Sequence, residues 1–334
     1  MKTFRTVFPI PPAPFTLTHT DRVCLVGSCF TEHIGARLSA GKFTTLTNPN
    51  GIVYNPVSIA RSLVPYPDAA PASESRDDQW PHVFSHNGLW HSWEHHGAFS
   101  APDRQALLDR LGQSQQEAAA FLQTTNRLLL TLGTADVFVL RETGRVVANC
   151  HKAPAGWFSQ RRLTVHETEQ VLADCIQNLK TVVPDLNVIL TVSPVRHLRL
   201  GAVENQRSKA VLVLACAGLC ERFDFVHYFP AYELLLDDLR DYRFYAPDMT
   251  HPNDVAIDYI WQHFADTYFP ADTQHLLGRI EKIRAAAAHR PFNPDTDEHR
   301  AFAGAQLKKI EQLIKEHPNL DWGSEKMYFQ LFQR

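Results

Sequence analysis

An apolar run passes directly into a helix-like pattern in the stretch VCLVGSCF (residues 23–30), which continues as TEHIGARL (residues 31–38). The first stretch predicts a buried strand over 23–26, and the second predicts a helix. A turn that carries a serine from the end of a strand to the N-terminus of a helix exposes the nucleophile in α/β hydrolytic folds. We therefore expect Ser28 to lie at the edge of a sheet with an accessible hydroxyl.

A matching signal lies near the other end of the chain, in the stretch DMTHP (residues 248–252). A serine hydroxyl is a weak nucleophile, so we assign Ser28 as the nucleophile and His251 as the base that takes its proton. Asp248 is expected to orient the imidazole and to stabilise its charged form. The competing interpretation makes Ser28 an N-cap and Asp248 a cap of the helix predicted to start at Pro252.

Strand-like and helix-like segments alternate along the first part of the chain, which predicts a parallel sheet with right-handed crossovers. The fold class that we expect is α/β, a three-layer sandwich with a central parallel sheet. The main strands are expected over 23–26, 43–47, 128–132, 187–192 and 225–228. Sites in such sheets lie at the carboxyl ends of the strands. We therefore expect Gly51, Thr134, Arg196 and His197 on one rim with Ser28.

Several short motifs are spread over residues 20–265. They are GSCF (27–30), NPNGIVYNP (48–56), NCHK (149–152), SPVRH (193–197), YFPAYE (228–233) and DYRFY (241–245). On these motifs the chain resembles the GSCFA domain family, with Thr31 where alanine is usual. That family resembles the SGNH, or GDSL-type, serine esterases. The resemblance implies a flavodoxin-like, SGNH-hydrolase-like fold and an esterase-like site.

The SGNH resemblance also implies an oxyanion hole made by the N–H of the nucleophile, a glycine N–H and an asparagine side chain. Ser28 and Gly51 fit the first two positions, although Gly51 also suits a turn that needs a positive φ. After the third strand the chain reads GTAD (residues 133–136), without asparagine. Thr134, through its hydroxyl or backbone, and Asn149, from the end of a predicted hairpin, are alternative donors, and the choice stays open.

Three further residues are predicted to contact the substrate. Arg196 and His197 follow the fourth strand, where they would bind a polar or anionic acyl or sugar substituent. An ion pair that closes the edge of the sheet is the alternative interpretation. His151 is assigned to the same role from its place in the NCHK motif. The thiol of Cys29 is expected to point away from the rim.

The stretch HSWEH (residues 91–95) matches the H-x-x-E-H pattern of inverted zinc peptidases. Zinc binding there would need a helix that presents His91 and His95 on one face. Glycines bracket the stretch and no amphipathic helix surrounds it, so we predict no metal site. We interpret residues 66–102 as a long loop or insertion, either a histidine-rich and aromatic lid over the site or a packed structural loop.

The composition argues against several classes of protein. A net charge of −3 and the lack of a basic stripe give no reason to expect nucleic-acid binding. No apolar run reaches about eighteen residues, and prolines interrupt residues 1–20, so we expect neither a membrane span nor a signal peptide. The six cysteines are not spaced like a disulfide scaffold. We therefore expect a cytoplasmic protein with reduced cysteines.

Beyond residue 270 the pattern changes to two charged helices, expected over 274–289 and 297–315. We therefore divide the chain into a hydrolase-like domain over 1–270 and a helical appendage over 271–334. The appendage is expected to serve packing or dimerisation, which makes a homodimer one expected partnership.

These features predict a serine esterase that hydrolyses a small-molecule acyl ester through an acyl-Ser28 intermediate, without a cofactor. The family analogy implies an acetylated carbohydrate or glycoside as substrate. Two alternatives stay open. One is a zinc-dependent hydrolase that uses His91 and His95. The other is a non-catalytic ligand-binding protein on the same fold, which the missing asparagine of the oxyanion hole favours.

Overall fold

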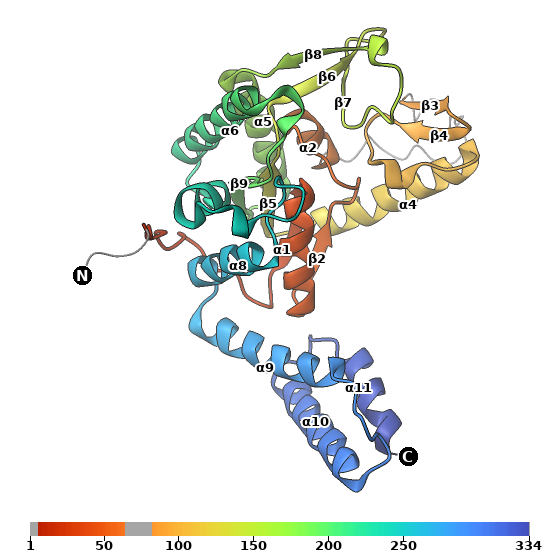
Figure 1. Cartoon of the computed structure of the whole chain (residues 1–334), viewed down its shortest axis with the longest axis vertical. Coiled ribbons are helices and arrows are strands. Elements are labelled where there is room, and N and C mark those ends of the chain that lie inside the picture. The colour runs from red at the N-terminus through yellow and green to blue at the C-terminus, as the bar shows by residue number, and fades with distance from the viewer. Residues whose placement is uncertain (1–5, 64–81, 334) are drawn as a thin grey trace.

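The protein is built around a five-stranded parallel sheet with the strand order β10-β9-β5-β1-β2 (Figure 1). The structure is a computed structural model that describes residues 6–63 and 82–333. The strands are β1 (Arg22–Gly27), β2 (Thr44–Thr47), β5 (Arg127–Leu132), β9 (Asn187–Val192) and β10 (Val226–Tyr228). In chain order this is the 2-1-3-4-5 arrangement of flavodoxin-like sheets. The predicted α/β fold with a central parallel sheet is confirmed.

Helices cover both faces of this sheet and make it the middle of three layers (Figure 1). On one face, Cys24 and Val26 of β1 pack with α2 (Pro56–Leu63), α5 (Val165–Val182) and α6 (Ala202–Arg222). On the other face, Val23 and Leu25 pack with α1 (Cys29–Ala40) and α8 (Asp254–Tyr268). Alternate residues of a strand point to opposite faces, so a strand buried on both sides is apolar throughout.

Two smaller sheets lie beside the central one. The first is a hairpin of β3 (Val83–His86) and β4 (Leu89–Ser92). The second, with the order β7-β6-β8, contains β6 (Asp136–Leu140), β7 (Val146–Val147) and β8 (Phe158–Arg162). The long loop expected over 66–102 falls partly on residues 64–81, which lie outside the described residues. Its described part contains the β3–β4 hairpin and η1 (Gly97–Phe99), so that part of the insertion has regular secondary structure where a long loop was expected.

The remaining elements are helical. They are η1 (Gly97–Phe99), α4 (Arg104–Leu122), η2 (Ala155–Trp157), η3 (Leu198–Leu200), α7 (Ala231–Glu233), the π-helix η4 (Leu234–Leu239) and η5 (Tyr242–Phe244). The helix expected to start at Pro252 starts instead at Asp254, and the side chain of Asn253 caps it by accepting from the N–H of Ala256. Asp248 is therefore not the cap of α8.

The C-terminal helices form a layer of their own below the sheet in Figure 1. They are α9 (Ala271–Ala288), α10 (Asp297–Glu316), α11 (Gly323–Gln330) and η6 (Leu331–Gln333). Their core contains Ile280, Ile310 and Phe329. Lys42 joins this layer to the end of α1, because its ammonium lies 3.0 Å from Glu325 and 4.5 Å from the ring centre of Trp322.

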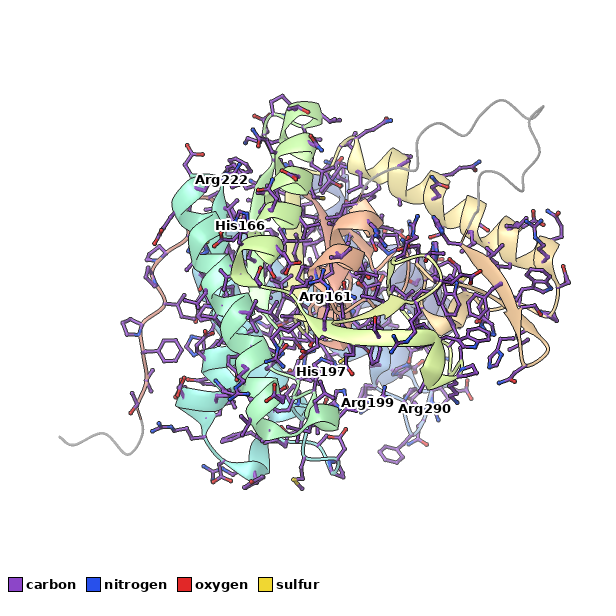
Figure 2. The ribbon with its side chains drawn as sticks, turned by 90° about the horizontal axis from the view of Figure 1, so that it is seen from above. Arg161, His166, His197, Arg199, Arg222 and Arg290 are labelled. Carbon is purple, nitrogen blue, oxygen red and sulfur yellow. The ribbon has the colours of Figure 1, made fainter. Side chains whose placement is uncertain are left out.

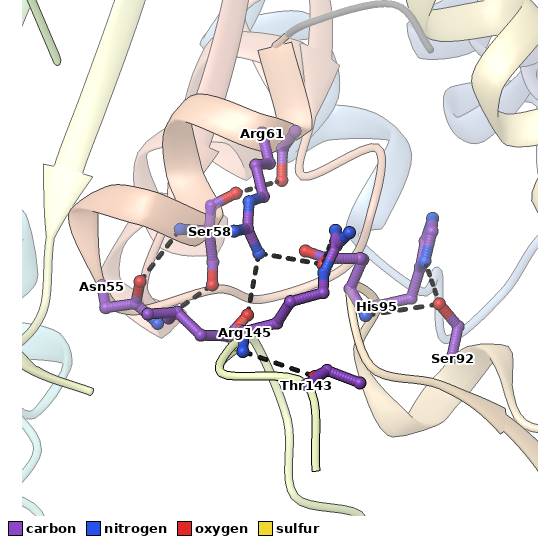
Figure 3. Close-up of polar contacts among 10 residues, drawn as sticks. Asn55, Ser58, Arg61, Ser92, His95, Thr143 and Arg145 are labelled. Atoms are coloured by element: carbon purple, nitrogen blue, oxygen red, sulfur yellow. Dashed lines mark hydrogen bonds and ion pairs between the residues drawn. The ribbon is translucent and has the colours of Figure 1, made fainter. Parts of the chain in front are cut away.

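A buried carboxylate fastens the 91–95 segment to the rest of the domain (Figure 3). Glu94 is 3% exposed, and its Oε1 accepts from Arg61 of α2 at 2.9 Å and from Arg145, before β7, at 3.0 Å. Arg61 also donates to the carbonyl of Val146 at 2.8 Å. Hydrogen bonds to charged groups contribute more to stability than neutral ones. These contacts therefore stabilise the packing of the 91–95 segment against α2 and against the residues before β7.

None of the helices in the described part of the chain has the length and apolar character that crossing a membrane requires.

We predict that Glu94→Gln lowers the free energy of unfolding by about 2 kcal/mol, because it weakens two charge-assisted hydrogen bonds in a buried place. Urea unfolding followed by circular dichroism measures the change. Asp297→Asn is the matched control, since Asp297 also pairs with an arginine but its side chain is 98% exposed. Equal losses in the two variants would show that the Glu94 contacts do not hold the domain together.

Candidate functional site

Ser28 lies where the sequence places it, between the end of β1 and the first residue of α1. Its side chain caps α1 by accepting from the N–H of Phe30 at 3.3 Å, and its own N–H donates to the carbonyl of Thr131 in β5 at 3.2 Å. The preceding N–H, of Gly27, donates to the side chain of Asn48 at 2.8 Å, and the Asn48 amide also meets Glu32 of α1. The end of β1 is thus fixed from three sides.

The accessible hydroxyl expected for Ser28 is not observed, because the residue is 0% exposed. The cause is the close packing of the strand ends around it. Val53 donates its N–H to the carbonyl of Gly27 at 3.1 Å and so draws the loop after β2 over the end of β1. In the described residues Ser28 shares no hydrogen bond with His251, and its hydroxyl meets the N–H of Phe30 instead.

Asp248 and His251 form a hydrogen-bonded pair in the loop before α8. The Nδ1 of His251 donates to Oδ2 of Asp248 at 2.6 Å, and Oδ1 accepts from the N–H groups of His251 and Thr250 at 3.0 and 2.9 Å. The backbone N–H of His251, then that of Thr250, then the imidazole hold the pKa of Asp248 well below its ordinary range. The carboxylate is therefore ionised and fixes the imidazole tautomer that leaves Nε2 as a base.

This pair lies beside the residues that surround Ser28. Arg196, after β9, donates its N–H to the carbonyl of Thr250 at 3.1 Å, which ties the loop of the pair to the rim of the sheet. Burial is the main cause of a lowered pKa in both His33 and His197, and the charge of His251 lowers both further. The pair is thus close to α1 on one side and to the loop after β9 on the other.

The N–H groups expected to form an oxyanion hole already donate to backbone carbonyls. That of Gly51, which has φ +74°, donates to Asn48 at 2.7 Å, and that of Thr134 donates to Tyr54 at 3.2 Å. The Thr134 hydroxyl also lies 3.0 Å from the hydroxyl of Ser208. Asn149 accepts from the N–H of His151 at 2.8 Å. Thr134 and Asn149 therefore remain alternatives, and the turn at Gly51 needs its positive φ.

A cavity of about 720 Å³ opens next to this rim. Tyr54, Thr134, Asn149, His151 and His197 line it, together with Phe138 and Phe158 of the second sheet. Four of the residues predicted for the oxyanion hole or substrate binding therefore share one cavity. Arg196 lines a different cavity, of about 580 Å³, with Tyr245 and Met249.

His197 and Arg199 lie between α6 and the second sheet (Figure 2). The Arg199 guanidinium is 5.4 Å from the ring centre of Phe138 in β6. Arg199 therefore joins the loop after β9 to the wall of the larger cavity, which it also lines.

Sequence reasoning missed a buried polar face on α6. Asn205, Ser208 and Lys209 are all at most 3% exposed and lie at helical spacings of three and four residues. The Lys209 ammonium donates to the carbonyls of Gly133 and Ser193, both at 2.7 Å. Burial, and then the charge of Arg196, lowers the pKa of Lys209 to about 7. Three polar residues on the buried stripe of a helix were the signal that the sequence offered.

The thiol of Cys29 is adjacent to Ser28 but is a poor nucleophile here. Burial raises the pKa of Cys29, and the charge of Asp248 raises it further. A protonated thiol attacks carbonyl carbon poorly, since the thiolate is the reactive form. The raised pKa of Cys29 therefore argues against a thiol nucleophile at this position.

The HSWEH stretch does not form the helix that a zinc peptidase needs. His91 lies on β4, and its two ring nitrogens meet the Ser100 hydroxyl at 2.7 Å and the His86 carbonyl at 3.1 Å. Nδ1 of His95 meets the Ser92 hydroxyl at 2.8 Å, and burial lowers the pKa of His95 to about 3. With Glu94 held by two arginines, the donor set is occupied by protein contacts.

His151 belongs to this histidine-rich region as well as to the cavity. Its Nε2 donates to the carbonyl of Ser92 at 2.7 Å, and its ring lies 4.6 Å from that of His91. Burial lowers the pKa of His151 to about 4, so the ring is neutral near pH 7. These contacts attach the HSWEH stretch to the wall of the cavity.

The fold is therefore a doubly wound α/β sheet with a serine and an Asp–His pair at its carboxyl edge. Residues 22–264 match the model of the GSCFA family, and residues 280–332 match that of the GSCFA domain protein C-terminal domain. The first match spans more than half of the chain, so the chain belongs to the GSCFA family. None of the curated proteins compared with the sequence matches it.

Two solved structures align with this chain at low similarity. One is a carbohydrate esterase family 2 enzyme with a carbohydrate-binding domain from Corynascus thermopiles (Myceliophthora fergusii). It aligns with a TM-score of 0.37 and 12% identity over 81% of this chain and 69% of that chain. The other is an acetyl xylan esterase from the rumen bacterium Butyrivibrio proteoclasticus. It aligns with a TM-score of 0.36 and 9% identity over 77% of this chain and 64% of that chain.

We predict that the purified protein holds substoichiometric zinc and that a chelator leaves its activity unchanged, because the nitrogens of His91 already have hydrogen-bond partners. Elemental analysis measures the zinc content. An ester-hydrolysis assay before and after dialysis against EDTA measures the activity. Stoichiometric zinc that is lost together with activity, and restored with it, would establish the zinc-dependent alternative.

Proposed function

We propose that this GSCFA protein is a serine esterase in which Ser28 is the nucleophile, His251 the base and Asp248 the residue that orients the base. The observation that supports this most is the Asp248–His251 pair. An ionised carboxylate 2.6 Å from Nδ1 holds the proton of the neutral imidazole on that nitrogen, so Nε2 is the nitrogen that can accept a proton. A helix cap would not need this contact, and α8 has a different cap in Asn253.

The proposed reaction has two halves. The Ser28 oxygen attacks the ester carbonyl, its proton moves to Nε2 of His251, and the carbonyl electrons move to oxygen. The tetrahedral intermediate collapses, and the leaving alcohol takes the proton from His251. Water then attacks the acyl-serine by the same route and releases the acid. Asp248 stabilises the imidazolium in both halves without contacting substrate.

The cavity beside the rim supports a small ester with a polar alcohol part. Its lining combines aromatic rings, from Tyr54, Phe138 and Phe158, with the amide groups of Asn149 and Gln160 and the hydroxyl groups of Thr134 and Ser159. Flat apolar rings with a few polar groups are what a sugar ring needs for orientation. An acetylated carbohydrate or glycoside is therefore the substrate class that we propose, in agreement with the family analogy.

A non-catalytic ligand-binding protein is the second candidate. The full burial of Ser28 and the occupied N–H groups of Gly51 and Thr134 favour it. A small fluorophosphonate separates the two functions, because it labels only a serine that reacts as a nucleophile. Labelling of Ser28, located by peptide mapping, supports the esterase, and the lack of any labelling supports the binding protein.

We predict that Ser28→Ala and His251→Ala each lower kcat by about a thousandfold or more on p-nitrophenyl acetate, because the two residues act as one unit. The double variant should be little worse than either single one. Asp248→Asn should be damaging, and less so if Thr250, whose hydroxyl lies 3.2 Å from Nδ1, holds the ring. Steady-state kinetics measure kcat for each variant. A His251→Ala enzyme that keeps most of the wild-type rate would refute the mechanism.

The pH dependence should belong to the imidazole and not to the carboxylate. Because the pKa of Asp248 is lowered, the carboxylate stays ionised as the pH falls from about 8 to about 5, and a general base accepts the serine proton only in its unprotonated form. We therefore predict that kcat/KM falls with acid in the wild type and that Asp248→Asn, although slower, keeps an acid limb. A flat profile in the wild type would exclude His251 as the base.

A further inference from the structure

The proposed esterase needs a hydrogen-bond donor for the oxygen that becomes negative when Ser28 attacks. Such donors must point at the place where charge develops and must not be used elsewhere. The N–H groups of Ser28, Gly51 and Thr134 all donate to backbone carbonyls. A side-chain donor at this rim is therefore required; an asparagine is missing after β5, and the Thr134 hydroxyl and the Asn149 amide are two candidates beside His197.

His197 is held rigidly at the same rim. Its N–H donates to the side chain of Asn205, on the buried face of α6, at 2.8 Å. The preceding residue, Arg196, donates to the carbonyl of Thr250 in the loop of the Asp–His pair. The backbone of His197 is thus fixed between α6 and the loop that carries His251.

The ring of His197 has an unused nitrogen. Nε2 is buried and has no hydrogen-bond partner among the described residues. The ring meets that of Tyr54 edge-on, with 5.2 Å between centres, and both residues line the larger cavity. Burying a polar atom without a partner is costly, so an orphaned nitrogen beside a cavity points to a ligand group that completes it.

The same groups surround His197 and the start of α1. The charge of Lys209 acts on the His197 imidazole and on the Cys29 thiol, which is next to Ser28. Tyr54, whose ring contacts that of His197, directly follows Val53. The N–H of Val53 donates at 3.1 Å to the carbonyl of Gly27, the residue before Ser28. His197 and Ser28 therefore belong to one small region at the ends of β1, β5 and β9.

The charge state of His197 suits a donor. Burial, then the charges of Lys209 and His251, lower its pKa to about 4. Near pH 7 the ring is neutral and keeps one N–H, so it can donate without adding a cation next to His251. A neutral imidazole also does not compete with His251 for the role of charged acid.

We propose that His197 donates its Nε2–H to the oxyanion formed when Ser28 attacks the ester carbonyl, and so supplies the donor that asparagine gives in related sites. This inference rests on the proposed esterase function. His197 keeps its proton throughout. The proton that moves is that of Ser28, which passes to His251 and then to the leaving alcohol, while the oxyanion electrons return to reform the carbonyl.

The test compares His197→Leu, which fills the space without a donor, with His197→Gln, whose amide keeps one. We expect His197→Leu to lower kcat on p-nitrophenyl acetate by about a hundredfold or more, with KM within about twofold, and to slow phosphonylation of Ser28 by a fluorophosphonate similarly. His197→Gln should recover part of both rates. His33→Gln is the matched control. The charge of His251 also lowers the pKa of His33, but His33 does not line the cavity.

Each outcome decides a different point. Unchanged kcat and phosphonylation in His197→Leu, with activity lost in Ser28→Ala, would overturn the inference and leave the esterase standing. If His197→Leu raises KM and leaves kcat unchanged, His197 contacts the substrate in the ground state only, and the inference is overturned in this case too. A wild-type protein without labelling at Ser28 would remove the esterase and the inference together. If the leucine variant does not fold, His197→Met replaces it in the same comparison.

Discussion

β1 and β5 approach so closely at Gly27 that a Cβ atom there would lie 2.3 Å from the carbonyl oxygen of Thr131. This approach lets the next N–H, that of Ser28, bond to the same carbonyl and sets the direction in which α1 leaves the sheet. Asn48 completes the junction by binding Gly27 and Glu32 at once. The position of Ser28 relative to the loops after β2 and β5 follows from this one contact between strands.

The loops after β5 and β9 depend on a second constraint, the buried polar face of α6. A buried ammonium is unfavourable unless its protons are bonded, and Lys209 donates to Gly133 and Ser193 at the ends of both strands. Ser208 supports Thr134 in the same way, and Asn205 supports His197. One face of α6 therefore holds the backbone of the two loops that meet at the rim. Through these contacts, the packing of α6 on β5 and β9 determines where the two loops lie at the site.

The sequence predicts what depends on local pattern. The strand over 187–192 is found with the same bounds as β9, and β1 and β5 differ from prediction by a residue or so, because strands buried on both faces are apolar throughout. The Asp–His contact also follows from a spacing of three residues. The β3–β4 hairpin was missed because its strands, VFSH and LWHS, are only four residues long and show no alternation of apolar and polar residues. The burial of Ser28 and the role of Lys209 depend on contacts between segments far apart in sequence, which periodicity does not record.

The proposed nucleophile and its base differ in how exposed they are and in how firmly their surroundings hold them. Ser28 is fully buried and its backbone is held by two strands and a helix, whereas the side chains of Asp248 and His251 are 50% and 45% exposed. Turning the Ser28 hydroxyl from Phe30 toward His251 gives up one capping hydrogen bond, a cost of about 1 kcal/mol. That cost is small beside the several kcal/mol that triads and oxyanion donors contribute to a reaction. In the proposed mechanism the Ser28 hydroxyl turns away from Phe30, while the hydrogen bond from its N–H to Thr131 keeps its backbone at the strand junction.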